Sequence, residues 1–106
     1  MSQITTHVLD TSSGRPAQGV PVLLEAAGGP GAWKELAKGV TNADGRVADL
    51  LAKDKVLAPW TYRMTFDTGA YFRAGKTKGF YPVVKVVFEL ESGHYNIPLL
   101  LSPFGY

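Results

Sequence analysis

Apolar and polar residues alternate with a period of two along much of this chain. In residues 60–67, apolar and aromatic side chains occupy every second position, with polar side chains between them. The same alternation runs through residues 4–9, 20–26, 83–90 and 94–101. Because successive side chains of a β-strand point to opposite faces, each segment is predicted to be a strand. The predicted apolar faces are Trp60, Tyr62, Met64 and Phe66; Val20, Val22, Leu24 and Ala26; Val84, Val86, Phe88 and Leu90; and Tyr95, Ile97, Leu99 and Leu101.

Clusters of turn-forming residues separate these segments. Gly, Pro, Asn, Asp and Ser are typical of tight turns, because they tolerate or favour the required backbone angles. Such clusters lie at residues 12–16, 27–31, 42–45 and 91–93. The segments between them predict two further short strands, at residues 33–40 and 46–49.

Seven or eight short strands at close spacing predict an all-β fold, a two-sheet antiparallel β-sandwich. Residues 69–76 break the alternation, and we expect one short helix there. The whole chain, 1–106, is expected to be a single domain, because 106 residues suffice for one modest core but not for two.

Composition narrows the functional classes. Hydrophobic residues make up 45% of the chain and charged residues 19%, which is typical of a folded globular protein. The net charge is +2 and no dense basic run occurs, so nucleic acid is not an expected partner. Without cysteine the chain has no disulfide or thiolate metal site, and with two histidines we expect neither a metal nor another cofactor.

The length of the apolar runs and the first residues bear on location. No stretch of about 18 apolar residues occurs, so no membrane association is expected. The opening Met-Ser-Gln-Ile-Thr has neither the basic start nor the apolar centre of a secretion signal. We therefore expect a cytoplasmic protein.

Two catalytic motifs are suggested by the sequence, and both are weak. Residues 70–77 fit a loose phosphate-binding loop, but such a loop joins a parallel strand to a following helix, and neither is expected here. Ser12 and Ser13 near His7 resemble a nucleophile with its base, yet nothing distinguishes these serines from ordinary turn residues. We interpret both as coincidences.

Three residues carry the more specific chemistry: His7, Arg46 and His94. His7 lies on the face of the first strand that also holds Thr5 and Leu9, Arg46 follows an Asp-Gly turn, and His94 opens the last strand. Taken singly, each is an ordinary surface or strand residue. If they meet in one groove, the imidazoles can move protons near neutral pH, and the guanidinium can hold a planar, carbonyl-rich ligand. This set suits metal-independent hydrolysis of a polar heterocycle.

Several motifs also resemble the transthyretin-related family. They are Ile4-Thr5-Thr6-His7-Val8-Leu9-Asp10 with Gly14-Arg15-Pro16-Ala17, then Thr41-Asn42-Ala43-Asp44-Gly45-Arg46, Phe80-Tyr81-Pro82, and the segment from His94 to Pro103. They cover nearly the whole chain in the family's order. The two histidines and the arginine resemble its 5-hydroxyisourate hydrolase branch rather than the hormone carriers.

The resemblance implies a fold, an assembly and a reaction. The fold would be an eight-stranded two-sheet sandwich with one short helix. The assembly would be a homotetramer, a dimer of dimers, with active sites in the channel between dimers. The reaction would be the hydrolysis of 5-hydroxyisourate, the product of urate oxidation, to 2-oxo-4-hydroxy-4-carboxy-5-ureidoimidazoline in purine catabolism.

The resemblance also implies roles for particular residues. His7, Arg46 and His94 match the family's catalytic trio. One histidine, with Arg46, would position and deprotonate the attacking water; Arg46 would hold substrate oxygens, and His94 would orient substrate or return the proton. Asn96 stands where many relatives carry another histidine, and the alternation places it on the face of His94. We expect it to hydrogen-bond substrate or water.

The family's enzymes usually close with Tyr-Arg-Gly-Ser, whereas this sequence ends at Tyr106, before that signature. The missing segment would be most of a last strand that pairs across a dimer and lines the channel. Its absence is expected to impair catalysis and to weaken the tetramer, or to leave a dimer.

Two alternatives to a hydrolase follow from the same residues. One is a transthyretin-like protein that binds a small aromatic ligand without hydrolysing it. The other is a structural sandwich domain without a ligand. The two histidines and the arginine favour the hydrolase, because a carrier of apolar hormone does not need two imidazoles facing water.

Overall fold

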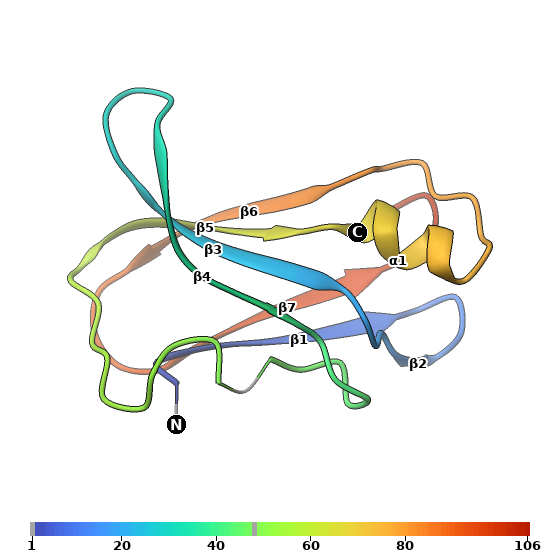
Figure 1. Cartoon of the computed structure of the whole chain (residues 1–106), viewed down its shortest axis with the longest axis horizontal. Helices are drawn as coiled ribbons and strands as arrows, with labels where there is room; N and C mark the ends of the chain where they lie inside the picture. Colours follow the sequence, from blue (N-terminus) through green and yellow to red (C-terminus); the bar gives the residue numbers. More distant parts are fainter. Residues whose placement is uncertain (1, 48) are drawn as a thin grey trace.

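The computed structural model describes residues 2–47 and 49–106 and consists mainly of two β-sheets that pack face to face (Figure 1). A short helix lies at one end of the sandwich, near the C-terminus. In chain order the elements are β1 (Ile4–Asp10), β2 (Arg15–Pro16), β3 (Pro21–Ala27), β4 (Trp33–Val40), β5 (Trp60–Phe66), α1 (Thr68–Ala74), β6 (Val84–Leu90) and β7 (Tyr95–Leu101). The predicted two-sheet β-fold with one short helix is confirmed.

The smaller sheet has the order β2-β1-β7. One of its pairings differs in direction from the antiparallel arrangement predicted from the sequence. β1 and β7 are parallel, with a register from Ile4 beside Tyr95 to Asp10 beside Leu101. An antiparallel sandwich was expected because short strands at close spacing are commonly joined as hairpins. β1 and β7 lie at opposite ends of the chain, with the other sheet between them in sequence, so no hairpin constrains their direction.

The larger sheet has the order β4-β3-β5-β6, and all its pairings are antiparallel. The register of β3 against β4 shifts between Leu24 and Glu25, which is a β-bulge. The β3–β4 hairpin extends past the rest of the sandwich in Figure 1. Bulges bend and twist a strand locally, which agrees with this departure from the body of the sheet.

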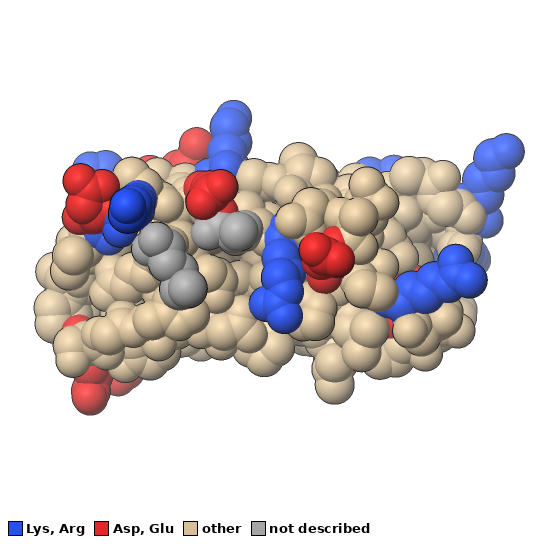
Figure 2. Space-filling view, turned by 90° about the horizontal axis from the view of Figure 1, so that it is seen from below, with Lys and Arg blue, Asp and Glu red and all other residues tan. Residues whose placement is uncertain are grey.

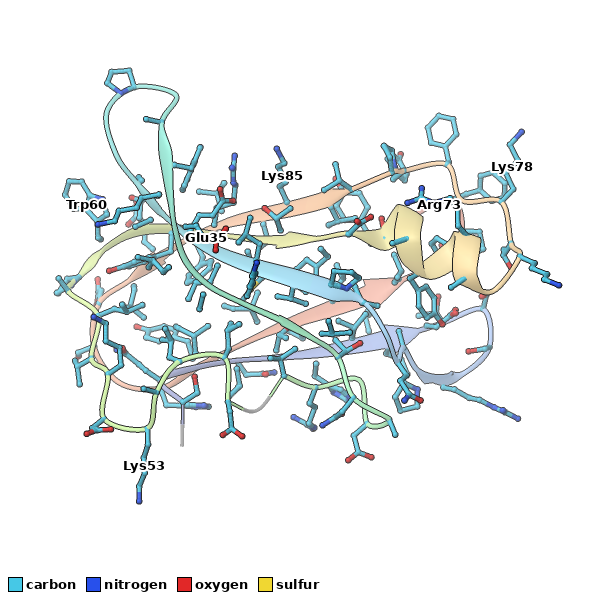
Figure 3. All side chains as sticks on the ribbon, viewed as in Figure 1. Glu35, Lys53, Trp60, Arg73, Lys78 and Lys85 are labelled. Carbon is cyan, nitrogen blue, oxygen red and sulfur yellow. The ribbon has the colours of Figure 1, made fainter. Side chains whose placement is uncertain are left out.

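The core lies between the sheets and follows the predicted alternation closely. Ile4 and Val8 of β1 are fully buried, as are Leu24 of β3 and Met64 of β5. Trp60 is the exception, because 57% of it is exposed. Its indole Nε1 donates a hydrogen bond to the carbonyl oxygen of Ala27 at 2.7 Å, and the side chain lies at the outer end of β5 (Figure 3). The first position of a strand can satisfy the alternation and still lie beyond the facing sheet.

The prediction of a strand at residues 46–49 is wrong, because Arg46, Val47 and Asp49 belong to no strand. The fourth residue, Ala48, lies outside the residues that the structure describes. Arg46 forms only an isolated bridge with His7, and Val47 belongs to no strand. The alternation failed here because the segment closes the core instead of extending a sheet. Val47 and Leu50 are both buried in the main apolar cluster.

Helix α1 confirms the helix predicted near residues 69–76. Asp67 caps its first turn, since the carboxylate accepts a hydrogen bond from the Ala70 N–H at 3.0 Å. The helix ends before Gly75, whose N–H bonds back to Tyr71. The glycine and lysine of residues 70–77 therefore follow a helix instead of preceding one, opposite to the order in a phosphate-binding loop. No helix in the described residues is long and apolar enough to cross a bilayer.

Candidate functional site

The predicted site residues gather on the outer face of the smaller sheet. His7 in β1 lies beside Pro98 of β7 and, on its other side, forms a β-bridge with Arg46. Thr5 lies beside Asn96 one row further along. Because side chains alternate between faces, turning Ile4 and Val8 into the core turns Thr5 and His7 outward. The structure thus brings segments about 40 and 90 residues apart onto one surface.

Arg46 is held by the turn that precedes it. The side-chain Oδ1 of Asn42 accepts hydrogen bonds from the backbone N–H groups of Asp44 and Arg46, at 2.9 and 3.1 Å. The Gly45 carbonyl accepts one from the Val8 N–H at 2.7 Å. Gly45 has a φ of +73°, and a Cβ there would collide with the carbonyl oxygen of Val8. Only glycine lets this turn lie so close to β1.

Thr5 is a site residue that the sequence analysis missed. Its Oγ1 lies 3.3 Å from Nε2 of His94 and 3.1 Å from Oδ1 of Asn96. The signal that could have identified it was its position on the face of His7, two residues away. The strand pairing that sets Thr5 beside Asn96 was not readable from the sequence.

The site is open in a single chain. His7 and Thr5 are half-buried, whereas Arg46, His94 and Asn96 are exposed. A hollow of about 280 Å³ lies beside His94, with Gln3 among its lining residues. Two imidazoles and one guanidinium on one surface can exchange protons with water and bind carbonyl oxygens. The surface does not enclose a small substrate by itself.

The described residues hold no group of three or more His, Cys, Asp or Glu side chains that could ligate a metal ion. The site itself offers two imidazoles, a guanidinium, an amide and a hydroxyl. The guanidinium is a cation with donors only and cannot ligate a metal. That the reaction needs neither a metal nor another cofactor stays a prediction.

A second polar cluster, also missed, joins the end of β1 to helix α1. The buried carboxylate of Asp10 accepts hydrogen bonds from the hydroxyl groups of Ser12 at 2.6 Å and Tyr71 at 2.7 Å. Burial acts to raise the pKa of Asp10, but hydrogen bonds from Ser12, Tyr71 and Ser13 outweigh it and lower this pKa. Burial, with the neighbouring Asp10 carboxylate, raises the pKa of Tyr71 to about 12. The cluster links the end of β1 to helix α1, and both carboxylate oxygens of Asp10 accept hydrogen bonds.

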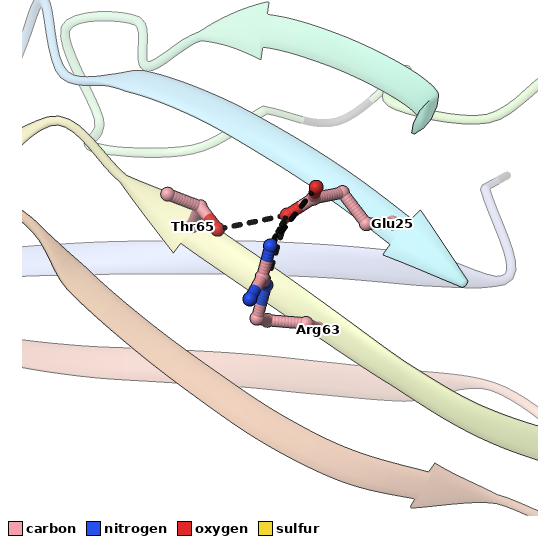
Figure 4. A network of polar contacts seen from close by, with 3 residues as sticks. All are labelled: Glu25, Arg63 and Thr65. Carbon is pink, nitrogen blue, oxygen red and sulfur yellow. Dashed lines mark hydrogen bonds and ion pairs between the residues drawn. The ribbon is translucent and has the colours of Figure 1, made fainter. Parts of the chain in front are cut away.

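A third cluster lies on the outer face of the larger sheet (Figure 4). Glu25 of β3 accepts two hydrogen bonds from Arg63 of β5, at 3.0 and 3.1 Å, and one from Thr65 at 3.1 Å. The Arg63 guanidinium also lies 4.3 Å from the centre of the Trp33 ring. Glu25 and Arg63 are directly opposite in the strand register. The arrangement stabilises the pairing of β3 and β5 beside the bulge.

Charges elsewhere are mixed in sign. In Figure 2, basic and acidic side chains lie near one another along the face shown. The net charge of +2 agrees with this mixture. That nucleic acid is not a partner stays a prediction.

Comparisons with known proteins bear on what this site does. The family model described as the HIUase/Transthyretin family matches residues 4–106. The "5-hydroxyisourate hydrolase" of Mus musculus is 44% identical over 108 residues, which cover 99% of this chain and 91% of the mouse protein.

Two solved structures have the same fold. Transthyretin from Sparus aurata superposes with a TM-score of 0.91 at 34% identity, covering 100% of this chain and 93% of the fish protein. The 5-hydroxyisourate hydrolase of Klebsiella pneumoniae superposes with a TM-score of 0.84 at 35% identity, covering 96% of this chain and 91% of the bacterial one. The fold is therefore common to a hydrolase and a transthyretin, and does not separate them.

Proposed function

Because this chain belongs to the HIUase/Transthyretin family, we propose that it is an enzyme that hydrolyses 5-hydroxyisourate in urate degradation. The observation that carries the proposal is the 44% identity to a protein named 5-hydroxyisourate hydrolase over almost the full length of both chains. Likeness in fold is weaker support, since a transthyretin superposes with a higher TM-score, 0.91, than a hydrolase does, 0.84.

The chemistry of the outer face favours hydrolysis over simple binding. Pockets for apolar ligands are lined mainly by apolar and aromatic side chains with few polar groups. Here His7, Arg46, His94 and Asn96 share one face, with the Thr5 hydroxyl between two of them. Such a surface is better suited to a water molecule and a carbonyl-rich ring than to a hydrophobic hormone.

The proposed mechanism uses these groups without a metal. A histidine, assisted by Arg46, takes a proton from water, and the water oxygen attacks a ring carbonyl carbon of the cyclic amide. The adjacent ring C–N bond breaks and the departing nitrogen receives a proton. The carboxylic acid that is left then loses its own proton to water and becomes a carboxylate. His7 and Arg46 are the residues proposed for water activation, and His94 and Asn96 for substrate orientation and proton return. General acid–base catalysis of this kind accelerates a reaction by about 10²–10⁴-fold.

We also propose that the active form is a homotetramer, a dimer of dimers. One chain leaves Arg46, His94 and Asn96 exposed, and Leu100 of β7, on their face by alternation, is 61% exposed. A second copy that covers Leu100 would also enclose the site. A separate aromatic cluster adds exposed apolar surface of the kind that marks interfaces. Its members are Phe80, Tyr81, Phe104 and Tyr106.

The test is to generate 5-hydroxyisourate with urate oxidase and to follow its ultraviolet absorbance with and without the protein. The proposal expects the decay to accelerate in proportion to protein concentration. A decay equal to the spontaneous rate, in a protein that still binds the compound, would favour the carrier instead.

Two further expectations stay predictions. Appending Tyr-Arg-Gly-Ser is expected to raise the rate in this assay and to strengthen the tetramer. A cytoplasmic location is to be checked by cell fractionation with an antibody to the native chain.

A further inference from the structure

The hydroxyl group of Thr5 lies between His94 and Asn96 and contacts both. The distances are 3.3 Å to Nε2 of His94 and 3.1 Å to Oδ1 of Asn96. Thr5 and Asn96 are paired positions in the parallel β1–β7 ladder, so the backbone holds the two side chains at this spacing. Thr5 is half-buried, whereas His94 and Asn96 are exposed.

A threonine hydroxyl carries one proton and can donate only one hydrogen bond. Oδ1 of Asn96 is a carbonyl oxygen and can only accept, so Thr5 donates to it. The Thr5 oxygen must then accept from His94, and the atom of His94 that faces it is Nε2. With the Asn96 amide in this orientation, the contact requires a proton on Nε2, and in the neutral ring the lone pair is then on Nδ1.

We propose that Thr5 is a positioning residue that fixes the Nε2–H tautomer of His94, so that Nδ1 is the nitrogen that delivers a proton to the departing ring nitrogen and afterwards takes up another from solvent. The same Nε2–H bond persists when Nδ1 takes up a proton, because both ring nitrogens donate in the imidazolium. One proton transfer to Nδ1 and back thus needs no rearrangement of Thr5 or Asn96.

This inference rests on the proposed function, because the cycling of Nδ1 matters only if His94 serves the reaction. The tautomer itself does not depend on activity. Ring ¹⁵N chemical shifts of His94 report which nitrogen is protonated. The sample is made alkaline until the spectrum shows a neutral ring, and the tautomer is then read. The expected result is protonated Nε2 in the native protein and a mixture of tautomers in Thr5→Val.

Three variants separate a positioning role from a structural one. Thr5→Val keeps the shape but removes the hydroxyl, and kcat is expected to fall about 3- to 10-fold, the value of one hydrogen bond, with a smaller change in KM. Thr5→Ser retains the hydroxyl and is expected to restore both the tautomer and the rate. Thr61→Val makes the same change on β5, where the hydroxyl has no hydrogen bond within the described residues, and should leave kcat unchanged.

The outcomes are distinguishable. A native protein with protonated Nδ1 on His94 would overturn the inference even if hydrolysis is fast, because it would mean that the Asn96 amide donates to Thr5 and Thr5 to His94. Unchanged kcat in Thr5→Val would overturn it as well. If the native protein has the expected tautomer but does not hydrolyse 5-hydroxyisourate, the proposed function fails, and with it the role of Nδ1.

Discussion

At the scale of single residues, backbone pairing determines which side chains can act together. His7 and Arg46 are neighbours because their main chains form a bridge, not because their side chains attract one another. Neither side chain contributes to the apolar core. Replacing them should therefore change chemistry much more than stability.

His7→Ala and Arg46→Ala are each expected to lower kcat/KM for 5-hydroxyisourate by about 10²–10⁴-fold, because each removes a group proposed to activate water. The ultraviolet decay assay measures this, and circular dichroism checks the fold. Arg73→Ala is the control, because it removes an exposed guanidinium from helix α1, away from the site (Figure 3). A near-normal rate in either site variant would exclude that residue from the mechanism.

The Asp10–Tyr71 hydrogen bond makes a residue-scale prediction about stability. Tyr71→Phe removes a donor to a buried carboxylate and should lower the free energy of unfolding at neutral pH by about 1.5–3 kcal/mol, measured by urea denaturation. Tyr81→Phe is the matched control, because its hydroxyl has no hydrogen bond within the described residues. Equal stability of the two variants would contradict the assigned bond.

The same pair predicts how stability depends on pH. The folded state lowers the pKa of Asp10, so its stabilisation is present above the ordinary value of 3.8 and is lost as pH falls through the lowered pKa. The folded state raises the pKa of Tyr71 from 10.0 to about 12, so its stabilisation is complete below pH 10 and is lost as pH rises toward 12. Urea titrations of Tyr71→Phe should show a shallower alkaline loss than the native chain. An unchanged alkaline limb would count against this assignment.

At the scale of elements, the turn of residues 42–45 acts as a rigid support for Arg46. Asn42 closes it with two side-chain hydrogen bonds, and Gly45 allows it to lie against β1. This loop belongs to neither sheet, yet its geometry fixes the backbone position from which the Arg46 side chain extends. A small displacement of the turn would move Arg46 relative to His7.

Gly45→Ala is expected to cost about 1–3 kcal/mol more stability than Gly14→Ala, because the added methyl group overpacks the contact with Val8. Gly14 has almost the same φ, +71° against +73°, but a Cβ there meets nothing within 4 Å. The comparison thus separates the contact from the backbone strain common to both. Thermal or urea unfolding measures it, and equal costs would refute the contact. Gly45→Ala should also slow hydrolysis on the order of 10²-fold, since misplacement of about 1 Å can cost that much.

At the scale of the whole molecule, the exposed site face and the exposed apolar residues point to the same requirement. Leu100 lies on the outer face of β7, two rows beyond Asn96. Burying it against another copy would remove apolar surface from water and enclose the imidazoles together. Assembly and activity are therefore expected to fail together.

Leu100→Asp is expected to reduce the assembly from a tetramer to a smaller species and to lower hydrolysis in parallel, because a carboxylate would have to be buried at the interface. Analytical ultracentrifugation over a range of concentrations measures the mass. Val40→Asp is the control, since Val40 is similarly exposed, at 58% against 61%, but lies on the other sheet. A Leu100→Asp protein with native mass and rate would rule out this face as the interface.

Part of the fold and of the site was predictable from the sequence, and the errors have physical causes. The alternation identified β1, β3, β5, β6 and β7, and the Asp-Gly pair identified the turn before Arg46, but the strand predicted to start at Arg46 is not formed. The alternation gave the wrong prediction at residues 46–49 and at Trp60, because at these positions the local pattern does not match the observed burial. Thr5, Asp10 and Tyr71 were missed because their partners come from distant segments.

The sequence by itself determined which side chains of β1, β3, β5, β6 and β7 turn toward the core, Trp60 excepted, because neighbouring residues of a strand point to opposite faces. The tertiary structure alone decided that β1 runs parallel to β7, that Thr5 lies between His94 and Asn96, and that Arg46 adjoins His7. Those contacts depend on the register between strands up to 91 residues apart, which no local pattern encodes.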